Sequence, residues 1–478
     1  MATFKSLPGF RDFYPEDCAI RNYTFSTWRE VAHSFSFQEW DAPVLESLEL
    51  FTEKSGEEIV SQLFNFEDKG GRKVSLRPEM TPSLARLVAA RAGTLRRPIK
   101  WFGIGENYRY EKQQRGRLRA FYQYNADILG EPGVSADAEI ISLCVESLRA
   151  FGLEKEDFCI RLSDRTLWFL FLAEIGIADE SLAVKVLSVV DKFERVSPEA
   201  LSEMMANALA GTGLDPAATL EKIRAFLGIS NFAQLKELFG GNERLAPRLA
   251  DWENLLALLE ALNAAQFVRV DLTIVRGLAY YTGFVFEAFQ LVGTGRALAG
   301  GGRYDKLVQK LGGPAIPAVG FGMGDVTLRN ILEEKKLLPR VRFAPDFYAI
   351  ILGEENRAAA LRDISNIRSG KLVRIEYSFK SGKFGKLIQT AEQSGARYVL
   401  IYGSNEVSCG LVKIRDTIER REVAFPSKNL FGTLMDILDN GLPEVDETPA
   451  ACRGDGNCAN CTCGARDNNA DDDAERNA

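Results

Sequence analysis

Two short stretches late in the chain combine arginine with glycine and tyrosine, residue types that together can hold an anion. Residues 276–283 read RGLAYYTG, and residues 300–307 read GGGRYDKL. An arginine beside small residues can approach phosphate or carboxylate oxygens closely, because no bulky side chain blocks the backbone and the guanidinium donates two parallel hydrogen bonds. Glycine clusters before polar residues are also common in turns and bulges, so each stretch needs support from the rest of the chain.

A predicted strand over residues 119–130, RAFYQYNADILG, carries a second set of polar groups. Side chains alternate along a strand, so its polar and apolar residues fall on opposite faces. The polar face carries Gln123, Asn125 and Asp127. Such a face could meet solvent or form the floor of a binding site. Just upstream, the same period places on one face Asn107, Arg109 and Glu111.

The order of the segments predicts an α+β protein. Strand-like and helical segments alternate at the start, the texture is helical from about 178 to 258, and strands resume after Thr273. Within the helical part, Ser197 followed by Pro198 is typical of a helix start. We interpret this part as a helical insertion between two β-rich halves.

Residues 346–427 predict a separate α/β domain, because strand-like and helical segments alternate again over enough chain for one small unit. Residues 440–478 have too little apolar content to fold unaided. This tail contains Cys452, Cys458, Cys461 and Cys463. Four thiolates could enclose Zn²⁺, but the spacing matches no standard zinc motif, so a metal site and a redox-vulnerable extension both stay open.

Composition is that of a globular protein. With 478 residues, 46% of them hydrophobic, the chain should hold two or three domains. No apolar run approaches the roughly 18 residues that span a bilayer, and the start lacks the apolar core of a signal peptide. Four cysteines are scattered through the globular part, which indicates a reduced compartment. We therefore expect a cytoplasmic protein without a membrane partner.

The formal charge of −7 comes almost entirely from the tail, so it says little about the partners of the body. Residues 368–386 carry six Lys or Arg side chains against the single acid Glu376. This stretch could contact phosphates or could be a solvated surface.

Several motifs together resemble those of histidyl-tRNA synthetases, which are class II aminoacyl-tRNA synthetases. Residues 107–111 with 119–130 resemble the second class II motif, and residues 76–82, LRPEMTP, resemble a Leu-Arg-Pro-Glu element of the histidyl enzymes. The stretches at 275–281 and 300–307 resemble their two specific signatures. The likeness covers roughly residues 5–427, and it places the dimer-forming first motif around Pro43.

This resemblance implies a class II antiparallel sheet flanked by helices. The catalytic domain would cover 1–340 with the insertion at about 178–258, the anticodon-binding domain 346–427, and a disordered acidic tail 440–478. The implied reaction is ATP-dependent activation of L-histidine to histidyl-adenylate, followed by transfer to tRNA(His). ATP with Mg²⁺, L-histidine and tRNA(His) are the implied cofactors and partners, and a homodimer is the implied assembly.

The resemblance also assigns roles to residues. The expected catalytic residues are Arg109 and Arg276, which would stabilise charge between the attacking carboxylate and the α-phosphate. The expected histidine-binding residues are Glu79, Met80, Thr81, Gln123, Asp127, Arg276, Tyr280 and Tyr281. The expected ATP-binding residues are Arg109, Glu111 and Arg117. The tRNA acceptor stem would lie near Arg115, Arg117 and Arg119.

Two positions depart from the family pattern. The third class II motif usually ends Gly-Leu-Glu-Arg, but residues 322–327 read GMGDVT without the arginine, and Ala279 replaces an aspartate. Arg329 stands two positions later, which in a helix rotates it by about 200°. The rival interpretations are a histidine-sensing regulatory paralogue that partners ATP phosphoribosyltransferase, and a non-catalytic nucleic-acid-binding module.

Overall fold

The computed structural model describes residues 4–52, 62–111, 116–193, 196–275, 280–293 and 295–443. The chain divides into two compact units, Met1–Val341 and Arg342–Ala478, which are described separately below. Several residues with predicted roles lie outside the described residues, namely Arg115, Arg276 and the tail cysteines Cys452, Cys458, Cys461 and Cys463.

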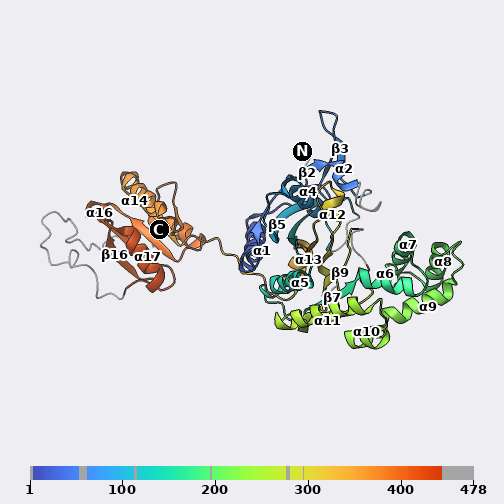
Figure 1. Ribbon diagram of the computed structural model, residues 1–478. Helices are drawn as coiled ribbons and strands as arrows, with labels where there is room; N and C mark the ends of the chain where they lie inside the picture. The colour runs from blue at the N-terminus through green and yellow to red at the C-terminus, as the bar shows by residue number, and fades with distance from the viewer. Residues whose placement is uncertain are drawn as a thin grey trace, which may run out of the picture. The chain divides into compact units, whose positions relative to one another are not determined.

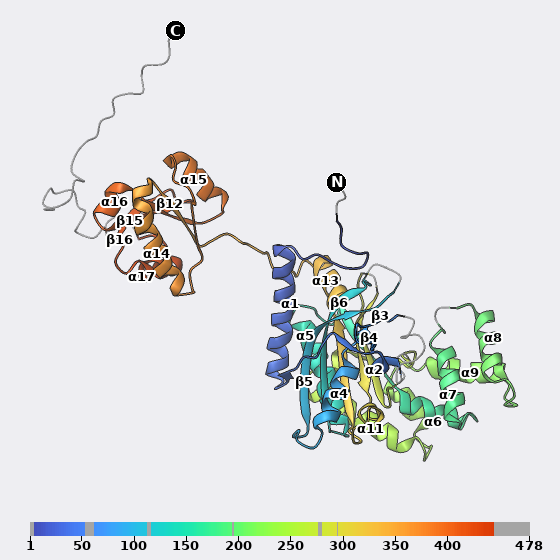
Figure 2. The same cartoon turned by 90° about the horizontal axis from the view of Figure 1, so that it is seen from above.

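In the described part of the first unit, eight strands form one large sheet (Figures 1 and 2). Its six central strands are antiparallel, in the order β5 (Ile99–Tyr108), β6 (Ala120–Leu129), β11 (Ala318–Gly324), β10 (Ala297–Arg303), β9 (Phe284–Gln290) and β7 (Phe158–Asp164). Short parallel strands complete the two edges, β1 (Gln38–Glu39) and β8 (Val268–Val270). The expected α+β class with an antiparallel-rich sheet is confirmed.

One face of the sheet packs against helices. These helices are α1 (Pro15–Ser34), α5 (Val134–Arg149) and α13 (Asp325–Glu334). Tyr124 of β6 lies in the core they cover, stacked on Trp28 of α1 at 5.4 Å between ring centroids. The apolar side of residues 119–130 therefore faces the main core, as the alternation predicted.

The other face of the sheet carries smaller elements. A three-stranded antiparallel sheet is formed by β2 (Leu45–Ser47), β4 (Lys73–Leu76) and β3 (Asn65–Glu67). The accompanying helices are α2 (Leu48–Thr52), α4 (Thr81–Arg91) and α12 (Leu307–Lys310). Met80, Leu84 and Tyr304 are buried together in a second core on this side. The loop from β4 to α4 is thereby held close to β6 and β10.

A lobe of helices lies between β7 and β8 and is green in Figures 1 and 2. Its helices are α6 (Arg165–Glu174), α7 (Glu180–Val190), α8 (Pro198–Ala208), α9 (Pro216–Leu227), α10 (Phe232–Phe239) and α11 (Ala246–Ala261). The predicted helix start is confirmed, because Ser197 caps α8 by accepting a hydrogen bond from the backbone N–H of Ala200. Asp164 anchors the lobe, since its buried carboxylate accepts hydrogen bonds from Arg248 and Trp252 of α11.

The second unit contains a five-stranded sheet. Its strand order is β13 (Ile375–Tyr377), β12 (Phe347–Ile351), β14 (Tyr398–Tyr402), β15 (Leu411–Asp416) and β16 (Glu422–Pro426). The described helices are α14 (Arg357–Ser369), α15 (Phe384–Gln393), α16 (Ser404–Ser408) and α17 (Leu430–Asn440). Helix α17 follows the predicted limit at 427 and packs Leu434 and Ile437 into the same core as Ile364. No helix among the described residues is long and apolar enough to cross a membrane.

Candidate active site

The polar face of β6 is a buried floor and not a solvent face. Asp127 is 1% exposed and Asn125 is 4% exposed. The neighbouring strand β11 places Gly320 opposite Asp127 and Gly322 opposite Asn125. A Cβ at Gly320 would strike the Asp127 carboxylate, and one at Gly322 would strike the amide of Gln123. These glycines therefore leave the room that the polar side chains occupy.

Asp127 is held by one hydroxyl and keeps one oxygen unbonded. Its Oδ1 accepts a hydrogen bond from Tyr304 Oη at 2.6 Å, whereas the buried Oδ2 has no hydrogen-bond partner among the described residues. Burial raises the pKa of Asp127 to about 7, the Tyr304 hydroxyl opposes the rise, and the negative charge of Glu79 adds to it. A hydrogen-bond donor arriving from a ligand would restore the ionised form.

Glu79 repeats this arrangement on the loop before α4. Its Oε2 accepts a hydrogen bond from Tyr280 Oη at 2.8 Å, and its buried Oε1 has no partner among the described residues. Burial raises the pKa of Glu79, while the Arg109 guanidinium and the Tyr280 hydroxyl act against that rise. A cationic ligand group beside Oε1 would favour the carboxylate.

Three tyrosines connect the two carboxylates. The ring centroid of Tyr280 lies 5.3 Å from that of Tyr281 and 5.7 Å from that of Tyr304. Burial raises the pKa of Tyr281, and the charges of Glu79 and Asp127 raise it further. The Tyr281 hydroxyl is therefore a neutral donor close to both acids.

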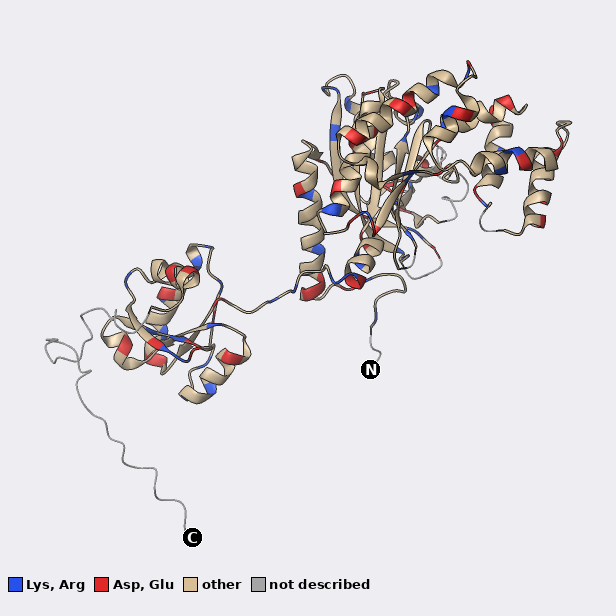
Figure 3. Ribbon diagram, turned by 90° about the horizontal axis from the view of Figure 1, so that it is seen from below, with Lys and Arg blue, Asp and Glu red and all other residues tan. Residues whose placement is uncertain are grey.

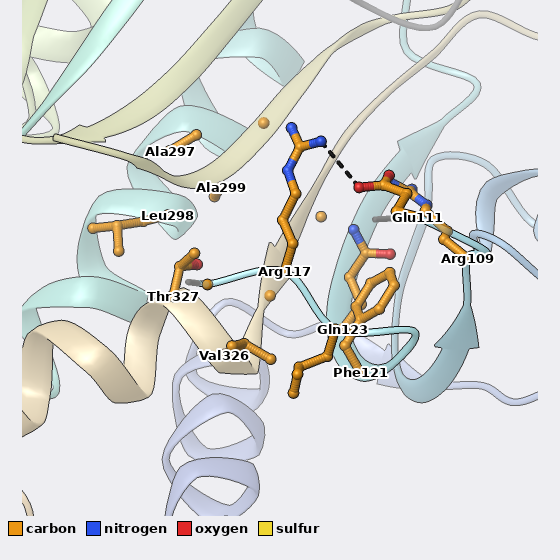
Figure 4. Close-up of a pocket in the computed structure, with 15 residues that line it drawn as sticks. Arg109, Glu111, Arg117, Phe121, Gln123, Ala297, Leu298, Ala299, Val326 and Thr327 are labelled. Carbon is orange, nitrogen blue, oxygen red and sulfur yellow. Dashed lines mark hydrogen bonds and ion pairs between the residues drawn. The ribbon is translucent and has the colours of Figure 1, made fainter. Parts of the chain in front are cut away.

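A cavity of about 270 Å³ lies beside Gln123 (Figure 4). From β5, β6 and their connection it is lined by Arg109, Glu111, Gly116, Arg117, Leu118, Phe121 and Gln123. From β10, β11 and α13 it is lined by Ala297, Leu298, Ala299, Gly300, Gly322, Gly324, Val326 and Thr327. Gln123 lies on both the polar floor and the cavity wall, and its Oε1 accepts a hydrogen bond from Asn107 Nδ2 at 3.1 Å.

Arg109 is positioned at the cavity without an ion-pair partner among the described residues. Its Nε donates to the backbone oxygen of Pro78 at 2.9 Å, and its guanidinium lies 5.4 Å from the ring centroid of Phe121. These contacts fix the side chain but do not neutralise it. The terminal nitrogens of Arg109 can therefore bind an anion that enters the cavity.

The other two described arginines of this region differ from each other. Arg117 lines the cavity and pairs with Glu111 at 2.9 Å, the contact drawn in Figure 4. Arg119 stacks its guanidinium 4.1 Å from the ring centroid of Tyr110 and does not line the cavity. A Cβ at Gly9 would strike the stem of Arg119, so this side chain also packs on the N-terminal segment.

The second glycine-rich stretch works differently from the sequence-based expectation. Arg303 does not face the cavity: it is buried, its Nε lies 3.1 Å from the Asp137 carboxylate, and its Nη2 donates to the backbone oxygen of Gly133. It thus binds a protein carboxylate and ties β10 to the start of α5. Sequence reasoning missed Tyr304, although the strand period places it on the face opposite Arg303.

Arg329 does not replace the missing third-motif arginine. Its Nη2 pairs with Asp17 at 2.9 Å and its Nε pairs with Glu333 at 2.7 Å. These partners lie on α1 and on α13 itself. Among the described residues, no group of three or more His, Cys, Asp or Glu side chains is arranged to hold a metal ion.

Comparisons with known proteins agree with this architecture. A family model described as histidyl-tRNA synthetase matches residues 9–327, and an anticodon binding domain model matches residues 347–436. The crystal structure of histidyl-tRNA synthetase from Nostoc sp. superposes with a TM-score of 0.72 at 22% identity, covering 91% of this chain and 99% of that one. The fold is therefore that of a class II synthetase with an anticodon-binding domain.

Curated relatives are more specific. The chain is 50% identical over 440 residues to a histidine–tRNA ligase of Opitutus terrae. The matched region covers 92% of this chain and 99% of the relative. It is 37% identical over 408 residues to a chloroplastic/mitochondrial histidine–tRNA ligase of Arabidopsis thaliana, covering 85% and 82%. The chain belongs to the histidyl-tRNA synthetase family, so the resemblance of its motifs is confirmed.

Proposed function

We propose that this protein activates L-histidine with ATP to form histidyl-adenylate and transfers the histidyl group to tRNA(His). One observation carries the proposal. Two buried carboxylates, Glu79 and Asp127, each keep one oxygen without a hydrogen-bond partner among the described residues, beside a cavity in which Arg109 has no ion pair. This combination suits an amino acid with a cationic group and a ring N–H, joined to an anionic nucleotide.

Histidine would lie between the two acids. Glu79, Thr81 and Gln123 would hold its α-ammonium, with Glu79 Oε1 as the main acceptor. A neutral imidazole offers one donor and one acceptor, which the carboxylate of Asp127 and the hydroxyl of Tyr281 can satisfy. The buried side chains of Met80 and Tyr280 would form the walls of this pocket.

ATP would occupy the cavity next to Gln123. Arg109 would bridge the attacking carboxylate and the α-phosphate, and family likeness assigns Arg276 to the same phosphate from another side. Their positive charge would stabilise the negative charge that grows in the transition state. Glu111 and Arg117 would contact the nucleotide from the cavity wall. Mg²⁺ would arrive as Mg·ATP, because this ion binds mainly through phosphates, waters and few carboxylates.

tRNA would contact both units. Arg115, Arg117 and Arg119 would meet the acceptor stem, and the second unit would bind the anticodon. Basic and acidic residues are interspersed over this unit (Figure 3). Binding of the anticodon would therefore depend on a local basic patch and not on the net charge of the unit. Lys380 and Lys383 are exposed, and Phe379, which precedes Lys380 in sequence, is 79% exposed. Cations next to an exposed aromatic ring suit a nucleic acid strand, since phosphates and bases can both be met.

We also propose a cytoplasmic homodimer. Val44 and Leu45 follow Pro43 of the first motif and are 41% and 40% exposed. Apolar side chains at this position would be covered by a second copy of the chain. The cytoplasm is proposed because charged tRNA is consumed there by translation.

Histidine-dependent exchange of labelled pyrophosphate into ATP, run beside a tRNA-charging assay, tests the proposal. The wild type should perform both reactions, and Arg109→Ala should lose about 10³-fold or more of the exchange rate. Arg329→Ala is the matched control and should retain the rate, because its partners lie outside the cavity. A histidine sensor would bind histidine without charging tRNA, and a nucleic-acid module would neither bind histidine nor exchange. Retained exchange in Arg276→Ala would reject the role assigned to that residue.

A further inference from the structure

We propose that Arg296 binds the terminal phosphates of the nucleotide and so takes the place of the third-motif arginine that this chain lacks. The inference rests on the proposed use of the cavity by ATP. It concerns a residue that belongs to none of the family motifs. The inference rests on two observations: the Arg296 side chain lies near the cavity, and the other arginines of this region except Arg109 are paired with carboxylates or packed elsewhere.

The cavity has too few uncompensated cations for a triphosphate. Its lining contains Arg109 and Arg117, and the charge of Arg117 is already balanced by Glu111 at 2.9 Å. On the side formed by α13 the lining side chains are Val326 and Thr327, which are uncharged. A bound nucleoside triphosphate would therefore meet Arg109 but would find no cation from α13.

Arg296 lies at this uncharged side. A Cβ built on Gly116 would lie 3.3 Å from Nη1 of Arg296 and 3.5 Å from Cγ2 of Thr327, so the guanidinium and Thr327 flank the same glycine. Gly116 and Thr327 both line the cavity, as does Ala297, the neighbour of Arg296 in sequence. Figure 4 shows Ala297 and Thr327 on the side of the cavity away from Arg109. Arg109 thus lines one side of the cavity, and Arg296, which is not itself a lining residue, lies next to the lining residues Gly116 and Ala297 of the other side.

The backbone of Arg296 is fixed while its guanidinium is not neutralised. The N–H of Gln290 donates to the carbonyl of Arg296 at 2.9 Å, which places Arg296 at the start of β10. Arg296 is only partly exposed, and it forms no ion pair among the described residues. By contrast, Arg303 and Arg329 are each paired with carboxylates. An anchored, half-buried guanidinium without a counter-ion is suited to bind phosphate oxygens.

Comparing nucleotides of different phosphate number tests this role directly. Isothermal titration of ATP and AMP to the wild type, Arg296→Ala and Arg296→Lys measures the contribution of the outer phosphates without any catalytic step. Arg296→Ala should bind ATP at least 10-fold more weakly and AMP with unchanged affinity. Arg296→Lys should lose less, because it keeps the charge but not the planar fork. Arg329→Ala, an arginine with two carboxylate partners, should bind both nucleotides as the wild type does.

Pyrophosphate exchange provides the second measurement. The KM for ATP should rise about 10-fold or more in Arg296→Ala, and the KM for histidine should stay constant, which also shows that the site is folded. Unchanged ATP affinity, or an equal loss for ATP and AMP, would overturn the proposal. Absence of exchange in the wild type would instead reject the proposed function, and the titration would still decide whether Arg296 contacts the outer phosphates.

Discussion

Replacing Asp127 by asparagine should stabilise the unliganded protein and at the same time abolish histidine activation. Burial raises the pKa of Asp127 to about 7, against an ordinary value of 3.8. A difference of about three units corresponds to roughly 4 kcal/mol at 1.4 kcal/mol per unit, by which the folded protein disfavours the ionised form. Asparagine has nearly the same size and carries no charge, so Asp127→Asn should remove most of this penalty. The new amide N–H₂ needs an acceptor, and we expect a net gain of about 2–4 kcal/mol at pH 8.

The stability gained by Asp127→Asn should increase as the pH rises. In the unfolded chain the aspartate loses its proton near its ordinary pKa, whereas the folded protein holds the proton up to about pH 7. The contribution of Asp127 to the stability of the wild type is therefore fully present below about pH 4 and is lost as the pH rises through about 7. The difference between Asp127→Asn and wild type should be small at pH 4, grow between pH 4 and 7, and stay constant above.

Urea unfolding followed by tryptophan fluorescence measures this difference. All five tryptophans of the chain lie in the first unit, so the signal reports that unit alone. In parallel, pyrophosphate exchange with histidine should fall at least 100-fold. Tyr304 holds Oδ1, so the amide N–H₂ of Asn would replace Oδ2, the proposed acceptor of the imidazole N–H, by a donor. If the variant were no more stable than the wild type at pH 8, or if the gain in stability were equal at pH 5 and pH 8, the reasoning would be refuted. Burial of the Asp127 carboxylate would then not destabilise the folded protein.

Tyr304→Phe should act in the opposite direction. The Tyr304 hydroxyl donates to Asp127 at 2.6 Å and holds its pKa below the value that burial alone would give. Its removal should cost about 1.5–3 kcal/mol at pH 8, where Asp127 is ionised, and less at pH 5. The KM for histidine should rise about 10-fold while the KM for ATP stays constant. A loss of stability that does not vary with pH would show that Tyr304 acts only by packing.

Three further substitutions test two glycines and the structural arginine of the sheet. Gly322→Ala should raise the KM for histidine, because the added Cβ would strike the Gln123 amide. At Gly300 an added Cβ would meet no atom within 4 Å, so Gly300→Ala should leave stability unchanged in thermal unfolding. Arg303→Met should cost about 3–5 kcal/mol in urea unfolding, because it leaves the buried Asp137 carboxylate unpaired, and the KM of the folded enzyme for either substrate should not change.

Local periodicity was sufficient to predict part of this site. The alternation over residues 119–130 placed Gln123 and Asp127 on one face correctly, because the side-chain period of a strand is a local property. The helix start at Ser197 was equally readable, since a cap and its hydrogen bond lie within one turn. Glu79, which was identified by its motif, lies close enough to Asp127 for its charge to raise the pKa of that carboxyl.

The remaining features depend on how distant strands are paired. Tyr304 reaches Asp127 only because β10 and β6 both pair with β11, and no local pattern fixes that register. The role of the β11 glycines also depends on strand pairing, because they leave room for the polar side chains of β6 only when they lie opposite them. A signal was present, because glycines at 320, 322 and 324 repeat with the period of two that the polar residues of β6 show. The sequence left the role of Arg303 open, because its partner Asp137 is far away in sequence.

In the proposed histidine pocket, the unpaired oxygens of the two acids would select the substrate. Each buried acid accepts a hydrogen bond from one tyrosine hydroxyl, Tyr280 for Glu79 and Tyr304 for Asp127, and its second oxygen has no hydrogen-bond partner among the described residues. The tyrosines offset part of the cost of burying charge, but they do not remove it, as the raised pKa values show. An amino acid without a ring N–H would leave Asp127 buried and unsatisfied. Sites that require a specific hydrogen bond reject such analogues by about 10⁴-fold or more, so the proposed pocket would select histidine through the acceptor that Asp127 leaves unpaired.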